Sequence, residues 1–119
     1  MIDTAIHILL VDDDVAHARL MSRACTKNSP HCQVIHVTNG DECLKRLTSE
    51  HFDVILLDYS LPRRNGLEVL AQIKALESAP PVIIVTGHGD ERIAVEAMKR
   101  GASDYLVKSV DGSHLEILP

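Results

Sequence analysis

Tryptophan is absent from this chain of 119 residues, and aromatic residues make up only 3% of it. A core with so few aromatic rings must be built from aliphatic side chains. Hydrophobic residues nevertheless account for 45% of the sequence, which excludes an intrinsically disordered chain. The length is that of one domain and is sufficient to bury a core.

An excess of basic residues is missing as well. The chain has 12 Lys and Arg against 17 Asp and Glu, a formal net charge of −5, which argues against a nucleic-acid surface. No apolar run is long enough to span a bilayer, and Asp3 lies where a signal peptide would carry basic residues. The three cysteines, Cys25, Cys32 and Cys43, are odd in number and lack metal-site spacing. We therefore expect reduced thiols in a cytoplasmic protein.

Short segments rich in Val, Ile and Leu are predicted to be strands. Runs this short and this uniformly apolar suit strands that are covered on both faces, as in a parallel sheet. The segments between them repeat apolar residues at helical spacing, and the fourth stripe, which we expect to be chiefly core, consists of Ile93, Ala94, Ala97 and Met98. The pattern predicts a three-layer α/β domain with helices on both faces of the sheet. The predicted strands are residues 6–11, 34–37, 53–58, 81–86 and, more weakly, 104–108.

Polar residues stand where these apolar runs end. They are Asp12 and Asp13 after the first run, Asp58 at the end of the third, Thr86 at the end of the fourth and Lys108 at the end of the fifth. Parallel strands point the same way, so we expect these side chains to converge at one edge of the sheet, where such folds place their functional sites.

Three carboxylates at one edge exceed the charge of one lysine. The residual negative charge favours a hard divalent cation, Mg²⁺ or Mn²⁺. Such a cation could bring a phosphoryl group to a carboxylate, while Lys108 and Thr86 contact the phosphoryl oxygens. Asp58 is then the expected nucleophile, which would form an acyl phosphate.

Four blocks of the sequence carry a resemblance to a known family. The segments LLVDDD, VILLDYSLPRRNG, VIIVTGHG and GASDYLVK occur in this order between residues 9 and 108. Together they resemble the signature blocks of the receiver domain of two-component response regulators. The resemblance implies a doubly wound, flavodoxin-like sheet of five parallel strands in the order 2-1-3-4-5. It also implies a signalling switch that accepts a phosphoryl group from a histidine kinase or a phosphotransfer protein and then changes the face formed by the fourth helix and fifth strand.

The resemblance also implies roles for individual residues. Asp58 would be the phosphoacceptor, Asp13 a direct metal ligand, and Asp12 a ligand through water. The main-chain carbonyl of Ser60 would be a further metal ligand. Thr86 and Lys108 would contact the phosphoryl group, and Tyr105 would change rotamer with Thr86.

Two departures from the family pattern lie after the last block. Ser109 follows Lys108 where the family usually has proline, so we expect a trans peptide bond there. The family ends in a full fifth helix, whereas this chain reaches Pro119 after SHLEILP. We expect residues 1–119 to form a single receiver domain with a truncated fifth helix and to be the N-terminal part of a longer protein. The short fifth helix should leave an exposed apolar patch that favours self-association.

Other interpretations remain for some of these residues. Asp14 is expected to cap a helix, and Arg63 and Arg64 to be solvated. His88 is either a surface residue or one that influences hydrolysis of the acyl phosphate. Cys32 and His36 are poorly spaced for a metal pair.

Two other classes of function compete with the phosphorylation switch. An aspartyl-phosphate phosphatase of the haloacid dehalogenase type would use Asp12 as its nucleophile, but Ala16 stands where that motif has Thr or Val, and the chain is short for its cap. A pseudo-receiver that serves only as a docking scaffold would be expected to lack a pocket residue, and none is missing.

Overall fold

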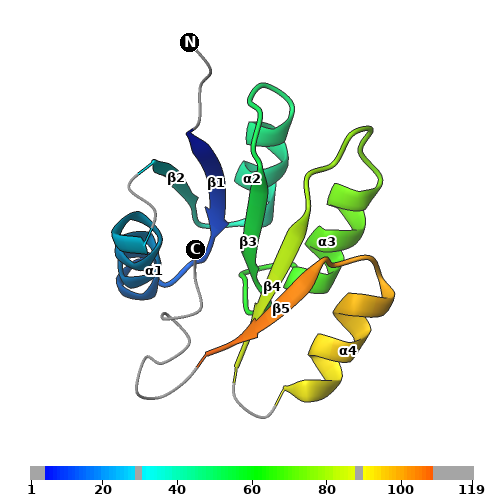
Figure 1. Cartoon of the computed structure of the whole chain (residues 1–119). Helices are drawn as coiled ribbons and strands as arrows, with labels where there is room; N and C mark the ends of the chain where they lie inside the picture. Colours follow the sequence, from blue (N-terminus) through cyan, green and yellow to red (C-terminus); the bar gives the residue numbers. More distant parts are fainter. Residues whose placement is uncertain (1–4, 29–30, 88–89, 109–119) are drawn as a thin grey trace.

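A parallel sheet of five strands forms the centre of the molecule (Figure 1). The computed structural model describes residues 5–28, 31–87 and 90–108. The strand order is β2-β1-β3-β4-β5, as predicted, and every pairing is parallel. The strands are β1 (Ile6–Val11), β2 (Cys32–Val37), β3 (Val54–Asp58), β4 (Val82–Thr86) and β5 (Asp104–Val107).

Helices connect the strands and cover both faces of the sheet. Figure 1 shows α1 on one face and α2, α3 and α4 on the other. The described helices are α1 (Val15–Asn28), α2 (Gly40–Leu47), α3 (Gly66–Lys74) and α4 (Glu91–Lys99). The predicted three-layer α/β architecture is therefore confirmed. None of the described helices combines the length and hydropathy that crossing a bilayer requires.

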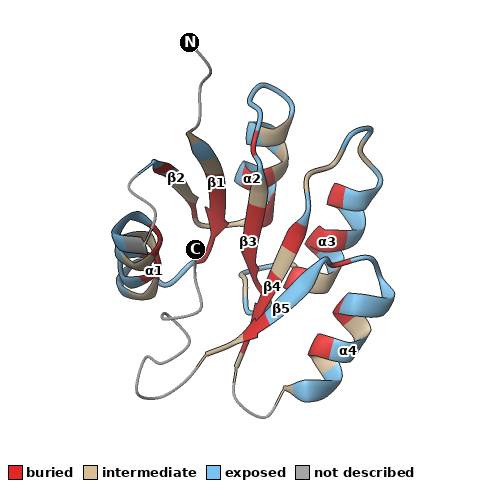
Figure 2. Ribbon diagram, viewed as in Figure 1, coloured by how far each residue is buried: buried red, intermediate tan, exposed pale blue. Residues whose placement is uncertain are grey.

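Alternate residues of each central strand face opposite layers. In β1, Leu9 and Val11 join the core beneath α2 and α3, whereas Ile8 and Leu10 join the core beneath α1. All four are at most 1% exposed. Strands buried on both faces explain the continuous apolar runs in the sequence, and Figure 2 shows this burial along β1 and β3.

Two sequence expectations about these elements need correction. The second strand begins at Cys32, two residues before the predicted start, because β2 pairs with β1 along its whole length, from Ile6 opposite Cys32 to Val11 opposite Val37. Its polar Gln33 is exposed on an edge strand, which breaks the apolar pattern. Met98 was expected in the core stripe of the fourth helix, but it is 43% exposed.

Several expectations concern the end of the chain. The Lys108–Ser109 bond and the truncated fifth helix involve residues 109–119, which lie outside the described residues. Of the described helices, α1 alone covers its face of the sheet, and α2, α3 and α4 cover the other face.

Local signals in the sequence fix several of the helix ends. Asn65 accepts a hydrogen bond from the Glu68 backbone N–H, and the Glu68 side chain accepts one from the Asn65 backbone N–H, which is a capping box at the start of α3. Asn39 caps α2 in a similar way through the Glu42 N–H. Gly101 follows α4 with a φ of 102°, a left-handed conformation that glycine adopts without strain.

Gly66 opens α3 where the helix passes close to the end of β3. A Cβ atom at this position would lie 2.7 Å from the carbonyl oxygen of Asp58 and 2.7 Å from the Cα of Tyr59. Both neighbours are backbone atoms that cannot rotate away. The helix therefore approaches Asp58 closely only because residue 66 has no side chain.

We expect Gly66→Ala to lower the free energy of unfolding by about 1–3 kcal/mol, the usual cost of overpacking, because the backbone of β3 or α3 must move. Gly87→Ala is the matched control. Its Cβ would meet only a side-chain oxygen of Asp90, at 3.2 Å, so the loss should be smaller. Urea unfolding measures both variants, and equal losses would contradict the proposed backbone clash.

Candidate functional site

Three carboxylates meet at the carboxyl edge of the sheet. Asp12 and Asp13 follow β1, and Asp58 is the last residue of β3. One ligand atom from each lies within 4.8 Å of the other two. Asp12 is 1% exposed and Asp58 3% exposed, while Asp13 is exposed to solvent. The predicted convergence is therefore present, with one open side at Asp13.

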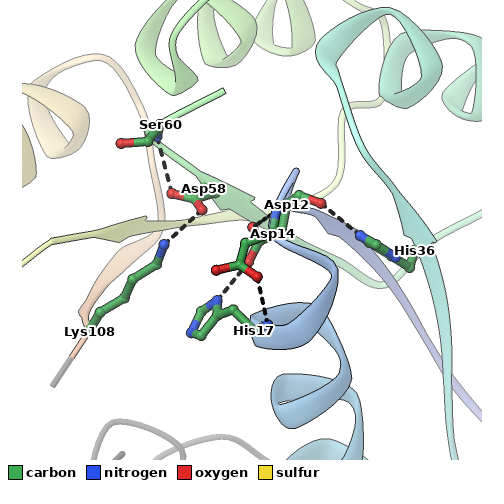
Figure 3. Close-up of polar contacts among 7 residues, drawn as sticks. All are labelled: Asp12, Asp14, His17, His36, Asp58, Ser60 and Lys108. Atoms are coloured by element: carbon green, nitrogen blue, oxygen red, sulfur yellow. Dashed lines mark hydrogen bonds and ion pairs between the residues drawn. The ribbon is translucent and has the colours of Figure 1, made fainter. Parts of the chain in front are cut away.

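Lys108 provides the positive charge beside this group. Its Nζ donates a hydrogen bond to Asp58 Oδ2 at 2.8 Å, and the Ser60 backbone N–H donates to Asp58 Oδ1 at 3.1 Å (Figure 3). The Lys108 backbone N–H also donates to the carbonyl of Thr86, which extends the pairing of β4 and β5 by one residue. Strand pairing thus places the lysine at the same edge of the sheet as Asp58, one strand beyond β4. Both carboxylate oxygens of Asp58 are hydrogen-bonded.

The two buried carboxylates have opposite pKa shifts. Burial raises the pKa of Asp58, and the nearby Asp12 charge adds to this, although the ion pair with Lys108 opposes it. Burial would also raise the pKa of Asp12, but hydrogen bonds from His17 and from the Asp14 backbone N–H outweigh it and lower that pKa. The charged form of Asp12 is therefore stabilised by its hydrogen bonds, whereas the charged form of Asp58 is disfavoured by burial and by the charge of Asp12.

Asp12 has partners that sequence reasoning missed. His17 Nδ1 lies 2.6 Å from Asp12 Oδ2, and His36 Nε2 lies 2.7 Å from the Asp12 main-chain oxygen. The signal for His17 was its place in the first turn of the helix that starts just after Asp12. The signal for His36 was its position next to the last residue of β2, beside the end of β1. Asp14 caps α1 as expected, because its Oδ1 accepts a hydrogen bond from the His17 N–H at 3.1 Å.

Thr86 ends β4 at the same edge of the sheet. It is fully buried, and its hydroxyl oxygen has no hydrogen-bond partner among the described residues. A buried hydroxyl without a partner is costly, so it is available to an incoming acceptor. Tyr105, on the neighbouring β5, is 46% exposed.

The remaining candidate residues lie at the rim or away from the site. Arg64 was expected to be solvated, but it is only part-exposed and pairs with Asp41 on α2 and Gln72 on α3. Arg63 is exposed, as expected, with a positive φ of 67°. Cys32 is buried with a free thiol, and none of the described residues adds a ligand to it and His36. His88 lies outside the described residues.

The donor set of the site fits a hard divalent cation. All three candidate side chains offer carboxylate oxygens, which Mg²⁺ and Mn²⁺ prefer over nitrogen or sulfur. The exposed Asp13 leaves a side through which a hydrated ion can enter. A cation would also offset the repulsion from Asp12, which adds to the effect of burial in raising the pKa of Asp58.

The chain belongs to the response regulator receiver domain family, whose model matches residues 8–117. It is 36% identical over 111 residues to the transcriptional regulatory protein ZraR of Escherichia coli, with 93% of this chain and 25% of ZraR covered. It is also 36% identical over 100 residues to the chemotaxis protein CheY of Listeria monocytogenes, with 84% of each chain covered. The chain therefore spans about a quarter of the length of ZraR.

Solved structures agree with this assignment. The phosphorylated cyanobacterial phytochrome response regulator RcpA superposes with a TM-score of 0.83 at 28% identity, covering 95% of this chain and 87% of RcpA. Receiver domains carry the phosphorylation-based signalling of two-component systems, and these relatives are regulators rather than enzymes. The family membership disfavours the dehalogenase-type phosphatase.

The raised pKa of Asp58 predicts a pH-dependent stability without divalent cations. Between the ordinary carboxyl value of 3.8 and the raised value, the folded state binds more protons than the unfolded state, so the contribution of Asp58 falls as the pH rises. Asp58→Asn cannot titrate. We therefore expect its stability relative to the wild type to improve with rising pH, measured by urea unfolding in EDTA from pH 3 to 7.

Asp53→Asn is the control for this series. A hydrogen bond from the His7 backbone N–H, followed by the contact with His51, lowers the pKa of Asp53, so this variant should lose stability relative to the wild type as the pH rises from the acid end. A stability difference for Asp58→Asn that is constant with pH, or that changes in the same direction as that of Asp53→Asn, would contradict the assignment.

Proposed function

We propose that this domain is a phosphorylation switch whose phosphoacceptor is Asp58. The supporting observation is that a buried carboxylate at the end of β3 has two more carboxylates and a lysine ammonium beside it. A histidine kinase or a histidine phosphotransfer protein would be the phosphoryl donor. The domain would not turn over an outside metabolite; its chemistry would be its own phosphorylation and dephosphorylation.

The transfer is a displacement at phosphorus. One carboxylate oxygen of Asp58 forms the new bond to phosphorus, the bond from phosphorus to the donor imidazole nitrogen breaks, and the electron pair stays with that nitrogen. Lys108 Nζ, which contacts Asp58 Oδ2 at 2.8 Å, is close enough to move onto a phosphoryl oxygen. Attack of water on the same phosphorus later releases inorganic phosphate and restores the carboxylate.

The acidic residues have a separate role in this scheme. Asp13 and Asp58 would hold Mg²⁺ or Mn²⁺ directly, with the main-chain carbonyl of Ser60, and Asp12 would act through water. When bound, the cation supplies positive charge to the phosphoryl oxygens. Asp13 suits a direct ligand because it is exposed. Asp12 suits the role of a ligand through water, because each of its carboxylate oxygens has one hydrogen-bond contact and keeps a lone-pair site for a water molecule.

The buried Thr86 hydroxyl would connect phosphorylation to the surface. It lacks a partner among the described residues, so donation to a phosphoryl oxygen would be a net gain for it. Its movement would leave space for Tyr105 to turn inward. Tyr105 and two α4 residues, Val95 and Met98, are between 43% and 55% exposed, so this face carries apolar surface that an output domain or partner protein could recognise.

Further features of the protein remain part of the proposal. The net charge of −5 supports a partner protein over direct contact with nucleic acid. The relatives named as transcriptional regulators are about four times longer than this chain, which supports control of a separate output domain. The three cysteines are free and buried, which supports a cytoplasmic location.

Phosphorylation by a small donor tests the function. We expect acetyl phosphate with Mg²⁺ to add one phosphoryl group to the wild type, and EDTA to prevent it. Asp58→Asn should abolish the labelling, and Lys108→Ala should reduce it at least tenfold, about 1.4 kcal/mol in the transition state. Intact-mass spectrometry measures each sample.

Asp53→Asn is the matched control, because Asp53 is an exposed aspartate just before the same strand. It should be labelled like the wild type. Labelling that survives Asp58→Asn, or that disappears only in Asp12→Asn, would refute Asp58 as the acceptor and favour the phosphatase-type nucleophile.

A further inference from the structure

Groups outside the acidic cluster contact both the carboxylate and the main chain of Asp12. Its Oδ2 contacts His17 Nδ1 at 2.6 Å, and its Oδ1 accepts a hydrogen bond from the Asp14 backbone N–H at 2.9 Å. Its main-chain oxygen lies 2.7 Å from His36 Nε2. Figure 3 shows the two histidines approaching Asp12 from different directions, one from α1 and one from β2. The backbone and the carboxylate of Asp12 are thus fixed separately.

The position of the His17 ring follows from the start of α1. Asp14 caps this helix by accepting the His17 backbone N–H, and the Asp14 N–H donates to Asp12. The ring of His17 then reaches back over the cap to Asp12, and its side chain is only 12% exposed. Asp12, Asp14 and His17 therefore form a closed loop of hydrogen bonds between β1 and α1.

The contact with His17 matters because Asp12 has unfavourable neighbours. Ligand atoms of Asp13 and Asp58 lie within 4.8 Å of it, and the repulsion would turn the carboxylate away if Oδ2 had no donor. A buried carboxylate oxygen that loses its donor also bears a desolvation cost. Each carboxylate oxygen has about two lone-pair sites, so His17 fixes the group and leaves a site on each oxygen for water.

We propose that His17 is a positioning residue for the cation site, whose Nδ1–H fixes the Asp12 carboxylate in the orientation that receives a hydrated divalent cation. The inference rests on the proposed function, because it gives Asp12 the outer role described there. His17 would not touch the cation. It would act as groups behind metal ligands commonly do, by orienting a ligand that has more than one orientation.

Mg²⁺ affinity of the unphosphorylated protein, measured by isothermal titration calorimetry, tests the proposal. His17→Leu removes the donor, and we expect the affinity to fall about tenfold, the low end for loss of a group behind a metal ligand. His17→Asn places an amide N–H near the position of Nδ1, so it should restore most of the affinity. Equal weakening in both variants would overturn the proposal, because the ring would then matter for packing rather than as a donor.

His51→Leu is the matched control. His51 also contacts an aspartate, with Nε2 at 3.2 Å from Asp53 Oδ1, but this pair is exposed and lies before β3, at the other end of the strand from Asp58. Its loss should leave the Mg²⁺ affinity unchanged. If the wild type binds Mg²⁺ and His17→Leu binds equally well, His17 has no positioning role. If the wild type itself does not bind Mg²⁺, the cation of the proposed function is refuted instead.

A measurement on the wild type keeps the proposal testable if His17→Leu does not fold. Saturation with Mg²⁺ should shift the ¹⁵N resonances of the His17 ring, because the Asp12 carboxylate that it contacts becomes charge-compensated. The His51 ring should not respond. A His17 ring that is as insensitive as His51 would overturn the proposal.

Discussion

Asp12 and Asp58 are buried beside each other at the carboxyl edge of the sheet, and the other polar contacts of the site offset the electrostatic cost of that pair. Lys108 neutralises part of the charge of Asp58, and His17 supplies a donor to Asp12. These contacts leave a residual negative charge, because one lysine stands against three carboxylates. This residual charge fits the divalent cation that the proposed function assigns to the site.

The fold places this pair through backbone geometry. Asp58 ends β3 in register with Val85, one residue before Thr86, so the carboxylate and the hydroxyl emerge at the same edge. Gly66 lets α3 approach the backbone of Asp58 and Tyr59 without a side chain between them. The site thus depends on strand register and on close helix packing, and its energy depends on the charges that the register brings together.

The sequence predicted those parts of the structure that follow from strand direction. Apolar runs that end in Asp12, Asp58, Thr86 and Lys108 were sufficient to place these residues at one edge, since parallel strands align their ends. The partners of Asp12 and of Arg64 were not predicted. A histidine in the first turn of a helix reads as a surface residue, and an arginine after a turn reads as solvated, until the packing of neighbouring elements is known. The predicted strand 34–37 is shorter than β2, because the exposed Gln33 on this edge strand interrupts the apolar pattern.

The central claim is that the carboxylate of Asp58, among three that lie together, carries the phosphoryl group. Borohydride reduces an aspartyl phosphate to homoserine and leaves free carboxylates intact. We would treat the protein with acetyl phosphate and Mg²⁺, reduce it, digest it and sequence the peptides by tandem mass spectrometry. Homoserine at position 58, absent when EDTA is present, is the result that we predict. Homoserine at position 12 or 13, or none at all after confirmed labelling, would contradict the account.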